Sequence, residues 1–247
     1  MIKILAIGNS FSEDALAYLW DLGHKNNIEF IIGNLFIGGC DLKTHVYYLN
    51  HQDKAYAYYK NTSGHYICEA QSLLYGLNDE IWDIITIQQA SHYSGKPETY
   101  KPHLHTLLKY IKENQPQAHI NFHQTWAYQQ DSQHPNFKDY NQDQMFMYKA
   151  IKNAVKEEVI KYIPLKSIIN VGLFIQICRA YGFGDQLTRD GFHLSYDVGR
   201  YLASLVWLVQ LTGINSININ HLDIVNHQDI KIINKCFKIF NEGNHSL

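Results

Sequence analysis

The stretch IGNSFSEDA, residues 7–15, separates a short apolar run from a segment with helical periodicity. Residues 2–7 are rich in β-branched side chains, a pattern typical of a strand that is covered on both faces. After the stretch, large apolar residues recur near a 3.6-residue period, and Glu13 and Asp14 suit the positive end of a helix dipole. The chain therefore begins with a strand, a tight turn and a helix, and Ser10 lies in the turn.

The same alternation of apolar runs and helical patterns continues along the chain. Four further strands are expected, at residues 28–39, 81–91, 117–128 and 166–172. Helices are expected at about 102–114, 142–162 and 195–211, the last of them ending before Gly213. Strands that alternate with helices predict an α/β fold with a central five-stranded parallel sheet, helices on both faces and right-handed connections.

Two tyrosine-rich segments, residues 54–61 and 64–70, predict a β-hairpin inserted outside the main sheet. Their tyrosines are interpreted as an amphipathic surface packed on the body of the protein, with a platform for substrate as the alternative. No repeat or linker divides the chain. Residues 1–247 are therefore expected to form one domain, with a core at 1–213 and a peripheral helix at about 229–241.

The composition restricts the classes of partner. The chain has 247 residues, of which 46% are hydrophobic, and its net charge of −2 favours neither nucleic acid nor an anionic membrane. Its apolar segments fall short of the roughly 20 residues needed to cross a bilayer. The first strand starts at Ile2 and leaves no room for a signal peptide, so the chain as given is expected to be cytoplasmic. A periplasmic or secreted location would require a leader that has been removed.

The cysteines and histidines do not form a recognised metal motif. Cysteines at positions 40, 68, 178 and 236 show no C-x-x-C spacing and are interpreted as small buried hydrophobes in a reducing compartment. Fourteen histidines raise the question of a metal, but no acidic or thiol partner stands at a recognised spacing. The sequence therefore predicts neither a metal nor another cofactor.

The segment RDGFHLS, residues 189–195, carries a possible set of reactive groups together with Ser10. Asp190 and His193 are three residues apart, close enough for the carboxylate to hold the ring by its Nδ1–H. A serine esterase needs a hydroxyl, an imidazole that activates it and an acid that orients the imidazole. If this segment lies over the carboxyl edge of the sheet, His193 would face Ser10 and complete such a set.

Four segments together resemble the SGNH, or GDSL-like, hydrolases, which are flavodoxin-like esterases and lipases with three α/β/α layers. These segments are GNSFS at residues 8–12, IGGCDLKTH at 37–45, QTWAY at 124–128 and LTRDGFHLS at 187–195. More narrowly, they look like a largely uncharacterised subgroup from gut Bacteroidetes, similar to the domain of unknown function 4886. The motif G-x-S-x-G is absent around Ser10, which disfavours an α/β-hydrolase.

The resemblance implies a role for each member of the predicted set. Ser10 would be the nucleophile, His193 the base and then the acid, and Asp190 the residue that orients His193. The backbone N–H groups of Ser10 and Gly39 would line the oxyanion hole.

The third donor of the oxyanion hole departs from the family pattern. The sequence Gly-x-Asn-Asp, whose Asn side chain donates in the family, is replaced by TIQQAS at residues 86–91. Gln88 is the first candidate for this donor and Gln89 the second, because neighbouring residues of a strand face opposite sides. Asn9 and Trp126 are expected to contact the substrate, and packing beneath a loop is the alternative for Trp126.

Several of these residues also have a purely structural interpretation. Ser12 is the local rival of Ser10 as nucleophile, but it better suits the N-cap of the first helix. Asp190 would cap the helix that follows it, and Gly39 would be glycine only because its backbone needs a positive φ.

The sequence thus predicts a metal-independent serine esterase that acts through an acyl-enzyme. Its expected substrate is a short acyl group, such as acetyl, on a carbohydrate or related small molecule. The rival hypothesis is a flavodoxin-like module that binds a phosphate or nucleotide at the first strand-to-helix turn without catalysis. A sugar-binding relative without activity is a third hypothesis, and the sequence makes no prediction of the oligomeric state.

Overall fold

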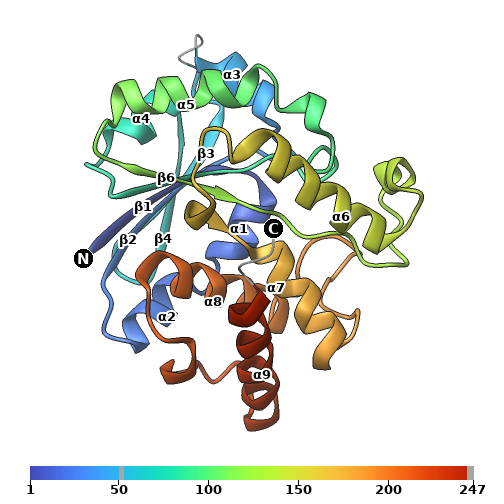
Figure 1. Ribbon diagram of the computed structural model, residues 1–247. Coiled ribbons are helices and arrows are strands. Elements are labelled where there is room, and N and C mark those ends of the chain that lie inside the picture. Colours follow the sequence, from blue (N-terminus) through green and yellow to red (C-terminus); the bar gives the residue numbers. More distant parts are fainter. Residues whose placement is uncertain (50–52, 244–247) are drawn as a thin grey trace.

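The computed structural model describes residues 1–49 and 53–243 and shows a sheet between two layers of helices (Figure 1). Within these residues the sheet has seven strands in the order β4-β3-β2-β1-β5-β6-β7. The strands are β1 (Ile2–Gly8), β2 (Phe30–Phe36), β3 (Tyr56–Asn61), β4 (Tyr66–Gln71), β5 (Ile84–Ile87), β6 (His119–His123) and β7 (Ile168–Ile169). The fold is α/β, as predicted, but the sheet is larger than expected.

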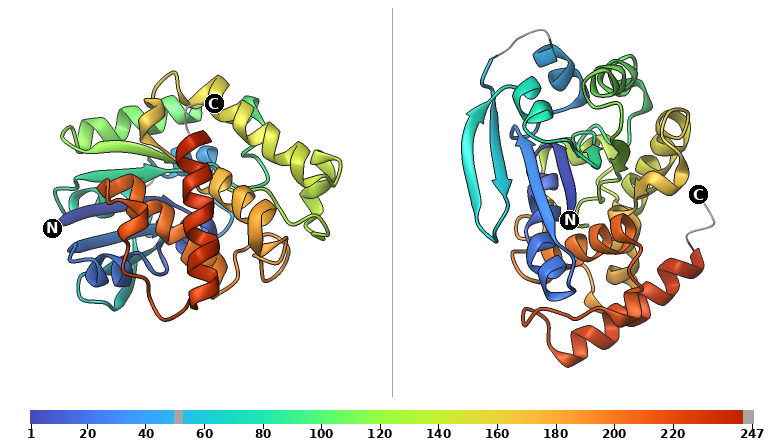
Figure 2. Two further views of the ribbon diagram at one scale, coloured as in Figure 1. Left: turned by 60° about the horizontal axis from the view of Figure 1, so that its bottom comes forward. Right: turned by 90° about the vertical axis from the view of Figure 1, so that its left-hand side faces the viewer.

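The additional strands come from the tyrosine-rich hairpin. Strands β2, β1, β5, β6 and β7 run parallel and account for the parallel sheet that the sequence predicts. Strand β3 pairs antiparallel with β2, with Tyr58 opposite Leu35, and β4 pairs antiparallel with β3. The hairpin therefore extends the main sheet instead of lying outside it (Figure 2). This pairing satisfies backbone groups that β2 would otherwise present as an open edge.

Helices cover both faces of the sheet. They are α1 (Ser10–Leu16), α2 (Leu19–Lys25), α3 (Leu42–Leu49), α4 (Leu73–Asn78), α5 (His103–Asn114), α6 (Gln144–Ala154), α7 (Val171–Cys178), α8 (Val198–Thr212) and α9 (His227–Gly243). Short 3₁₀ or π turns lie at Pro97–Thr99, Pro135–Tyr140, Val155–Val159, Leu165–Ser167, Arg179–Phe183 and Ser216–Asn218. Helices α3, α4 and α5 lie on one face, and α1, α2, α7 and α8 lie on the other (Figure 1).

Strand β1 is buried on both faces and lies at the centre of the fold. Ile4 and Ala6 join the hydrophobic cluster that includes α1 and α8, whereas Leu5 and Ile7 join the cluster that includes α5. The strand has β2 on one side and β5 on the other, so the connection from β1 to β2 and the later connection to β5 run in opposite directions across the sheet. In open α/β sheets, ligands bind at the carboxyl ends of strands at such a point. Helix α1 begins there, at Ser10.

Helix α9 contributes to the core, although the sequence predicts a peripheral helix at about 229–241. Phe237 and Phe240 are buried, and their ring centroids lie 4.3 Å and 5.4 Å from that of Phe174 in α7. The organisation of the chain into one domain stays a prediction. The packing of α9 against α7 favours it. Among the residues that the structure describes, no helix has both the length and the apolar character needed to span a bilayer.

Candidate active site

The carboxyl end of β1 brings together the three residues that the sequence predicts as a catalytic set. Ser10 is the first residue of α1, and its Oγ–H donates to His193 Nε2 at 2.8 Å. The ring Nδ1–H of His193 donates to Asp190 Oδ2 at 2.6 Å. Ser10 and His193 are 183 residues apart in the chain, so only the tertiary fold brings them into contact. The three side chains form one continuous series of hydrogen bonds.

The charge on Asp190 determines the tautomer of His193. Burial alone would raise the pKa of Asp190, but hydrogen bonds from the His193 ring and from two backbone N–H groups outweigh it. The pKa of Asp190 therefore lies below its ordinary value. Because an ionised carboxylate only accepts hydrogen bonds, Nδ1 of His193 carries the proton and Nε2 accepts one. His193 is thus oriented to take the proton of Ser10.

A buried carboxylate holds residues 187–195, here called the histidine loop, against α1. Asp14 is fully buried and accepts hydrogen bonds from Arg200 Nε at 2.7 Å and from Arg189 Nη1 at 3.0 Å. Its second oxygen accepts the backbone N–H of Leu194 at 2.8 Å. Two guanidinium groups compensate the buried charge, which would otherwise be strongly unfavourable. Asp14 therefore fixes the histidine loop to the helix that carries the serine.

Trp126 packs beneath the histidine loop, between the loop and Phe11 of α1. It has no exposed surface, its ring stacks on Phe11 with centroids 4.0 Å apart, and its Nε1–H donates to Phe192 O at 2.8 Å. The structure corrects the expectation that Trp126 contacts substrate, because a fully buried ring packs beneath the loop. The loop also requires Gly191, whose φ is +90° and whose added Cβ would lie 2.9 Å from Ser132 Oγ.

Asn9 joins the serine turn to the glycine turn after β2. Its Nδ2 donates to Cys40 O at 2.9 Å. Its Oδ1 accepts the Phe11 N–H at 3.0 Å and Gln88 Nε2–H at 2.7 Å. Asn9 is therefore the N-cap of α1, a position that was predicted for Ser12. Asn9 borders the Ser10 cavity but is 2% exposed, so its amide organises the turn.

Neither glutamine at the end of β5 directs its amide into the Ser10 cavity. Gln88 Nε2 donates to Asn9 Oδ1, and its Oε1 accepts the Nδ1–H of His123 at 2.9 Å. Gln89 Nε2 donates to Thr99, and both glutamines are 1% exposed. The structure corrects the expectation of a glutamine donor in the oxyanion hole. Both amides form hydrogen bonds with protein groups and stabilise the residues around the site.

The backbone N–H groups of Ser10 and Gly39 are available to a developing oxyanion. Among the described residues, neither has a hydrogen-bond acceptor, and both residues line the same cavity. Gly39 has a φ of +64°, and a Cβ added to it would meet no atom within 4 Å. Backbone conformation, and not crowding, therefore favours glycine at this position.

The Ser10 cavity has a volume of about 360 Å³ and is also lined by His92 and His134, which are not among the predicted site residues. Burial lowers the pKa of both rings, so both are neutral at pH 7. His134 Nδ1 accepts the Asn136 N–H at 3.2 Å, which leaves the proton on Nε2. The position of His92 just after β5, at the same sheet edge as Ser10, is a usable sequence signal. His134 lies in a long loop without a periodic pattern.

The geometry does not favour the rival phosphate site at this turn. Ser12 is buried, and its single hydroxyl proton is shared between two protein acceptors, Asn9 O at 2.7 Å and Asn34 Oδ1 at 2.9 Å. Asp190 adds a negative charge two hydrogen bonds away from Ser10, which would repel an anion. Within the described part of the chain, no three His, Cys, Asp or Glu side chains are arranged to hold a metal ion.

Solved structures of similar shape define the class of fold. A catalytic mutant of an acetylxylan esterase from Geobacillus stearothermophilus has a TM-score of 0.54 and 12% identity, covering 90% of this chain and 97% of that one. A protein from Slackia heliotrinireducens, proposed to be an SGNH hydrolase, has a TM-score of 0.54 and 20% identity, covering 85% and 98%. At such identities the likeness concerns the fold alone. The fold is that of the SGNH hydrolases.

A closer match defines the family. The crystal structure of a DUF4886 family protein from Bacteroides uniformis has a TM-score of 0.91 and 40% identity, covering 95% of this chain and 92% of that one. The model of the "Domain of unknown function (DUF4886)" matches residues 3–236. The chain therefore belongs to the DUF4886 family, and the resemblance inferred from the four segments is confirmed. No curated protein matches the sequence.

Proposed function

We propose that the protein is a serine esterase that hydrolyses a carboxylic ester through an acyl-enzyme on Ser10. The observation that carries the proposal is the series of hydrogen bonds from Ser10 through His193 to Asp190, at a cavity of about 360 Å³. A hydroxyl, a correctly oriented imidazole and a carboxylate are the groups that nucleophilic ester hydrolysis requires. The hydrolase fold of the structural neighbours supports an enzyme.

Each step of the proposed reaction uses a group already described. Ser10 Oγ attacks the ester carbonyl carbon while His193 Nε2 takes its proton, and the Ser10 and Gly39 N–H groups stabilise the oxyanion. The tetrahedral intermediate then breaks its bond to the alcohol oxygen, which receives the proton from His193. Water attacks the acyl-enzyme with His193 again as base, and the carboxylic acid leaves as Ser10 regains its proton.

A short acyl group on a carbohydrate is the proposed substrate class. The cavity volume is near the lower end of the range of about 300–1,000 Å³ found for small-molecule sites, which favours a small acyl group. The neutral rings of His92 and His134 suit hydroxyl groups of a substrate better than charged groups. Acetylxylan esterases among the structural neighbours suggest acetyl as the first group to test.

The direct test combines hydrolysis of p-nitrophenyl acetate with covalent labelling by a fluorophosphonate, followed by intact mass spectrometry. The wild-type protein should turn over the ester and gain one label. Ser10→Ala should lose the label and about 10³-fold or more of the rate. Ser12→Ala is the matched control and should keep the label, because the Ser12 hydroxyl faces Asn34 and not His193.

The outcomes separate the hypotheses. Labelling that persists in Ser10→Ala would contradict the assignment of the nucleophile. p-Nitrophenyl butyrate and octanoate test the acyl length, and a rate that rises with chain length would contradict a short acyl group. A folded wild-type protein that binds acetylated xylobiose but hydrolyses none of these esters would favour the inactive sugar-binding relative.

A further inference from the structure

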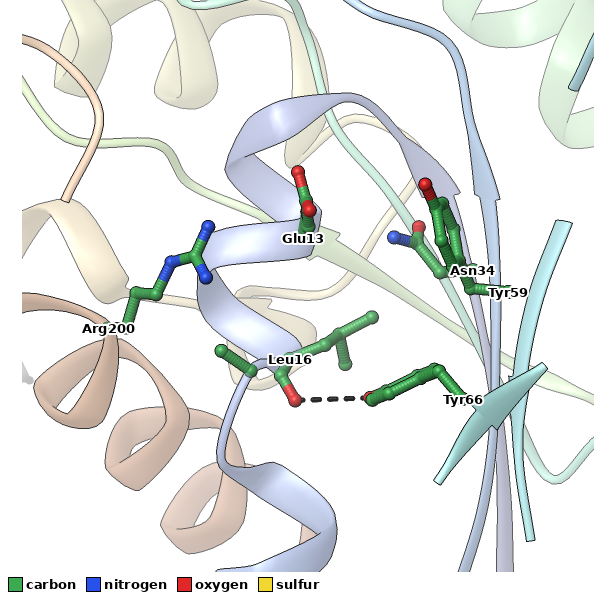
Figure 3. A pocket seen from close by; sticks show the side chains of 7 residues that line it. Glu13, Leu16, Asn34, Tyr59, Tyr66 and Arg200 are labelled. Atoms are coloured by element: carbon green, nitrogen blue, oxygen red, sulfur yellow. Dashed lines mark hydrogen bonds between the residues drawn. The ribbon is translucent and has the colours of Figure 1, made fainter. Parts of the chain in front are cut away.

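A second cavity, of about 240 Å³, lies along α1 beyond the serine (Figure 3). The residues that the structure describes around it are different from those around the Ser10 cavity. Leu16, the last residue of α1, and Ala17, its C-cap, contribute an apolar surface. Tyr59 from β3 and Tyr66 from β4 lie on the side of the hairpin, and the Tyr66 hydroxyl donates to Leu16 O at 3.2 Å. The cavity thus combines an apolar surface with two aromatic rings.

Asn34 presents an unpaired donor to this cavity. The residue lies on β2 and is 2% exposed. Its Oδ1 accepts the hydroxyl of Ser12 at 2.9 Å, whereas its Nδ2 has no acceptor among the described residues. Figure 3 shows the amide nitrogen pointing from the strand towards the helix side of the cavity. Nδ2 is not enclosed by the protein, so it can donate to an acceptor that enters the cavity from outside the chain.

The cavity also has an unpaired acceptor and a balanced charge. The Glu13 carboxylate borders the cavity and makes no hydrogen bond or ion pair within residues 1–49 and 53–243. In Figure 3, Arg200 lies on the other side of α1 from Asn34 and Tyr59. Its Nε donates to Asp14, and its Cζ lies 4.8 Å from the centroid of the Tyr196 ring. One carboxylate and one guanidinium together favour a ligand without net charge over an ammonium ion or a carboxylate.

Sugar rings match this set of groups. Neighbouring hydroxyls of a sugar both donate and accept, so one unit can donate to a carboxylate and accept from an amide. The C–H face of a sugar is apolar and packs against aromatic rings and aliphatic side chains. A volume of about 240 Å³ is below the range of about 300–1,000 Å³ for drug-sized ligands and suits a single unit.

We propose that this cavity is a binding site for one neutral sugar unit, separate from the Ser10 cavity. Sugar hydroxyls donate to Glu13 and accept from Asn34 Nδ2, and the ring packs between the hairpin tyrosines and the Leu16–Ala17 surface. The site gives the tyrosine-rich hairpin a function beyond covering the edge of β2. It does not depend on ester hydrolysis, because it uses none of the residues of the Ser10 cavity.

The test follows the Ala17 methyl signal by NMR in Ser10→Ala protein labelled with [¹³C-methyl]alanine, with Ala17→Ser assigning the signal. Cellobiose, xylobiose, mannobiose and chitobiose are the probes, each without acyl groups. At least one of them should shift the Ala17 signal in a saturable manner at up to about 50 mM, the range expected for a weak site. Neither the nucleophile nor an ester is present, so the result is independent of the proposed activity.

Two variants identify the binding groups. Glu13→Gln keeps the shape of the side chain and should weaken binding about tenfold, as expected for a lost hydrogen bond to a charged acceptor. Tyr59→Leu removes one ring and should weaken it to a similar extent. Glu113→Gln in α5, on the other face of the sheet, is the matched control and should leave the dissociation constant unchanged.

Three results would overturn the proposal. The first is an Ala17 signal that none of the four disaccharides shifts. The second is a dissociation constant that neither Glu13→Gln nor Tyr59→Leu alters in folded protein. The third is saturation of the Ala17 signal by choline but by no sugar, which would make the cavity a site for cations.

Discussion

His193 and His123 both use ring Nδ1 to donate a hydrogen bond near the carboxyl edge of the sheet, but they differ in partner and burial. His193 donates to the Asp190 carboxylate at 2.6 Å, and its side chain is 20% exposed. His123 donates to the amide oxygen of Gln88 at 2.9 Å and is 1% exposed. Burial lowers the pKa of His123 to about 3, so this ring stays neutral. A charged partner and access to solvent, and not mere proximity to Ser10, suit an imidazole to proton transfer.

The two rings also depend on different parts of the fold. His123 is the last residue of β6, and the pairing of that strand with its neighbours determines its position. His193 lies in the histidine loop, which Asp14 and Trp126 join to the rest of the fold through hydrogen bonds to Leu194 N–H and Phe192 O. We therefore expect substitutions far away in the sequence to alter the position of His193 in the histidine loop. We do not expect them to alter the position of His123 in β6.

The largest expected effect comes from removing the charge beside His193. In Asp190→Asn, two backbone N–H groups hold the amide oxygen in the place of Oδ1, so the amide NH₂ faces His193 Nδ1. The ring must then carry its proton on Nε2 and cannot accept that of Ser10, and kcat should fall about 10³–10⁴-fold. Steady-state hydrolysis of p-nitrophenyl acetate measures this loss. Asp223→Asn is the matched control. Equal rates for the two variants would contradict the claim that the charged partner of His193 suits it to proton transfer.

The next effect concerns the anchor of the histidine loop. Asp14→Ala leaves two guanidinium groups and the Leu194 N–H without their acceptor, and should lower the free energy of unfolding by about 3 kcal/mol. Urea unfolding followed by circular dichroism measures this change. The exposed Asp21→Ala in α2 should change it by less than about 1 kcal/mol. A similar small change in Asp14→Ala would show that the loop is held by other contacts.

The pH dependence of stability tests the burial of His123. Its pKa is about 3 in the folded protein and about 6.5 when unfolded, so the unfolded state binds more protons between these values. The stabilisation is complete above pH 6.5 and decreases as the pH falls, by about 2 kcal/mol at pH 5.

His123→Asn keeps a donor towards Gln88 and removes the titration. Urea unfolding at pH 7 and pH 5 should therefore show a loss about 2 kcal/mol smaller in the variant than in the wild type. Burial also lowers the pKa of His45, to about 4, but His45 is present in both proteins and cancels. Parallel pH profiles for the two proteins would contradict the assignment of a buried neutral His123.

The smallest effect should follow the loss of the amide between His123 and Asn9. Gln88→Met has a similar size but neither accepts from His123 nor donates to Asn9, and unfolding free energy should fall by about 1 kcal/mol. The turn at Ser10 loses one support, so kcat for p-nitrophenyl acetate should fall a few-fold without a change in KM. A loss as large as that of Asp190→Asn would instead return Gln88 to the oxyanion hole.

Local patterns explain which features could be predicted from the sequence. The strand, turn and helix around Ser10 follow from apolar periodicity over a few residues, and the Asp190–His193 pair follows from a separation of three residues. Asp14 shows the limit of such patterns. In the sequence it is one of two acids suited to a helix dipole, whereas in the fold it is the buried partner of two arginines from the far end of the chain.

Side-chain direction explains most of the corrections. Gln88 and Trp126 lie at the predicted edge of the sheet, but each has partners behind the site that no sequence pattern records. The hairpin is predicted correctly as two strands, yet its pairing partner depends on which edge of the sheet is open. His134 is missed because it enters the cavity from a loop without periodicity, whereas the position of His92 just after β5 is a signal that could have found it.

The sequence alone determined the α/β class, the order of strands and helices along the chain, and the pairing of Asp190 with His193. Each of these features depends on residues that are only a few positions apart. Only the tertiary structure decided that His193 meets Ser10 across 183 residues and that Asp14 secures this contact. It also decided that the amides of Gln88 and Gln89 bind protein groups and do not face the Ser10 cavity. Hydrogen bonds and charge pairs act over a few ångströms in space, so their partners become defined only when distant segments are packed together.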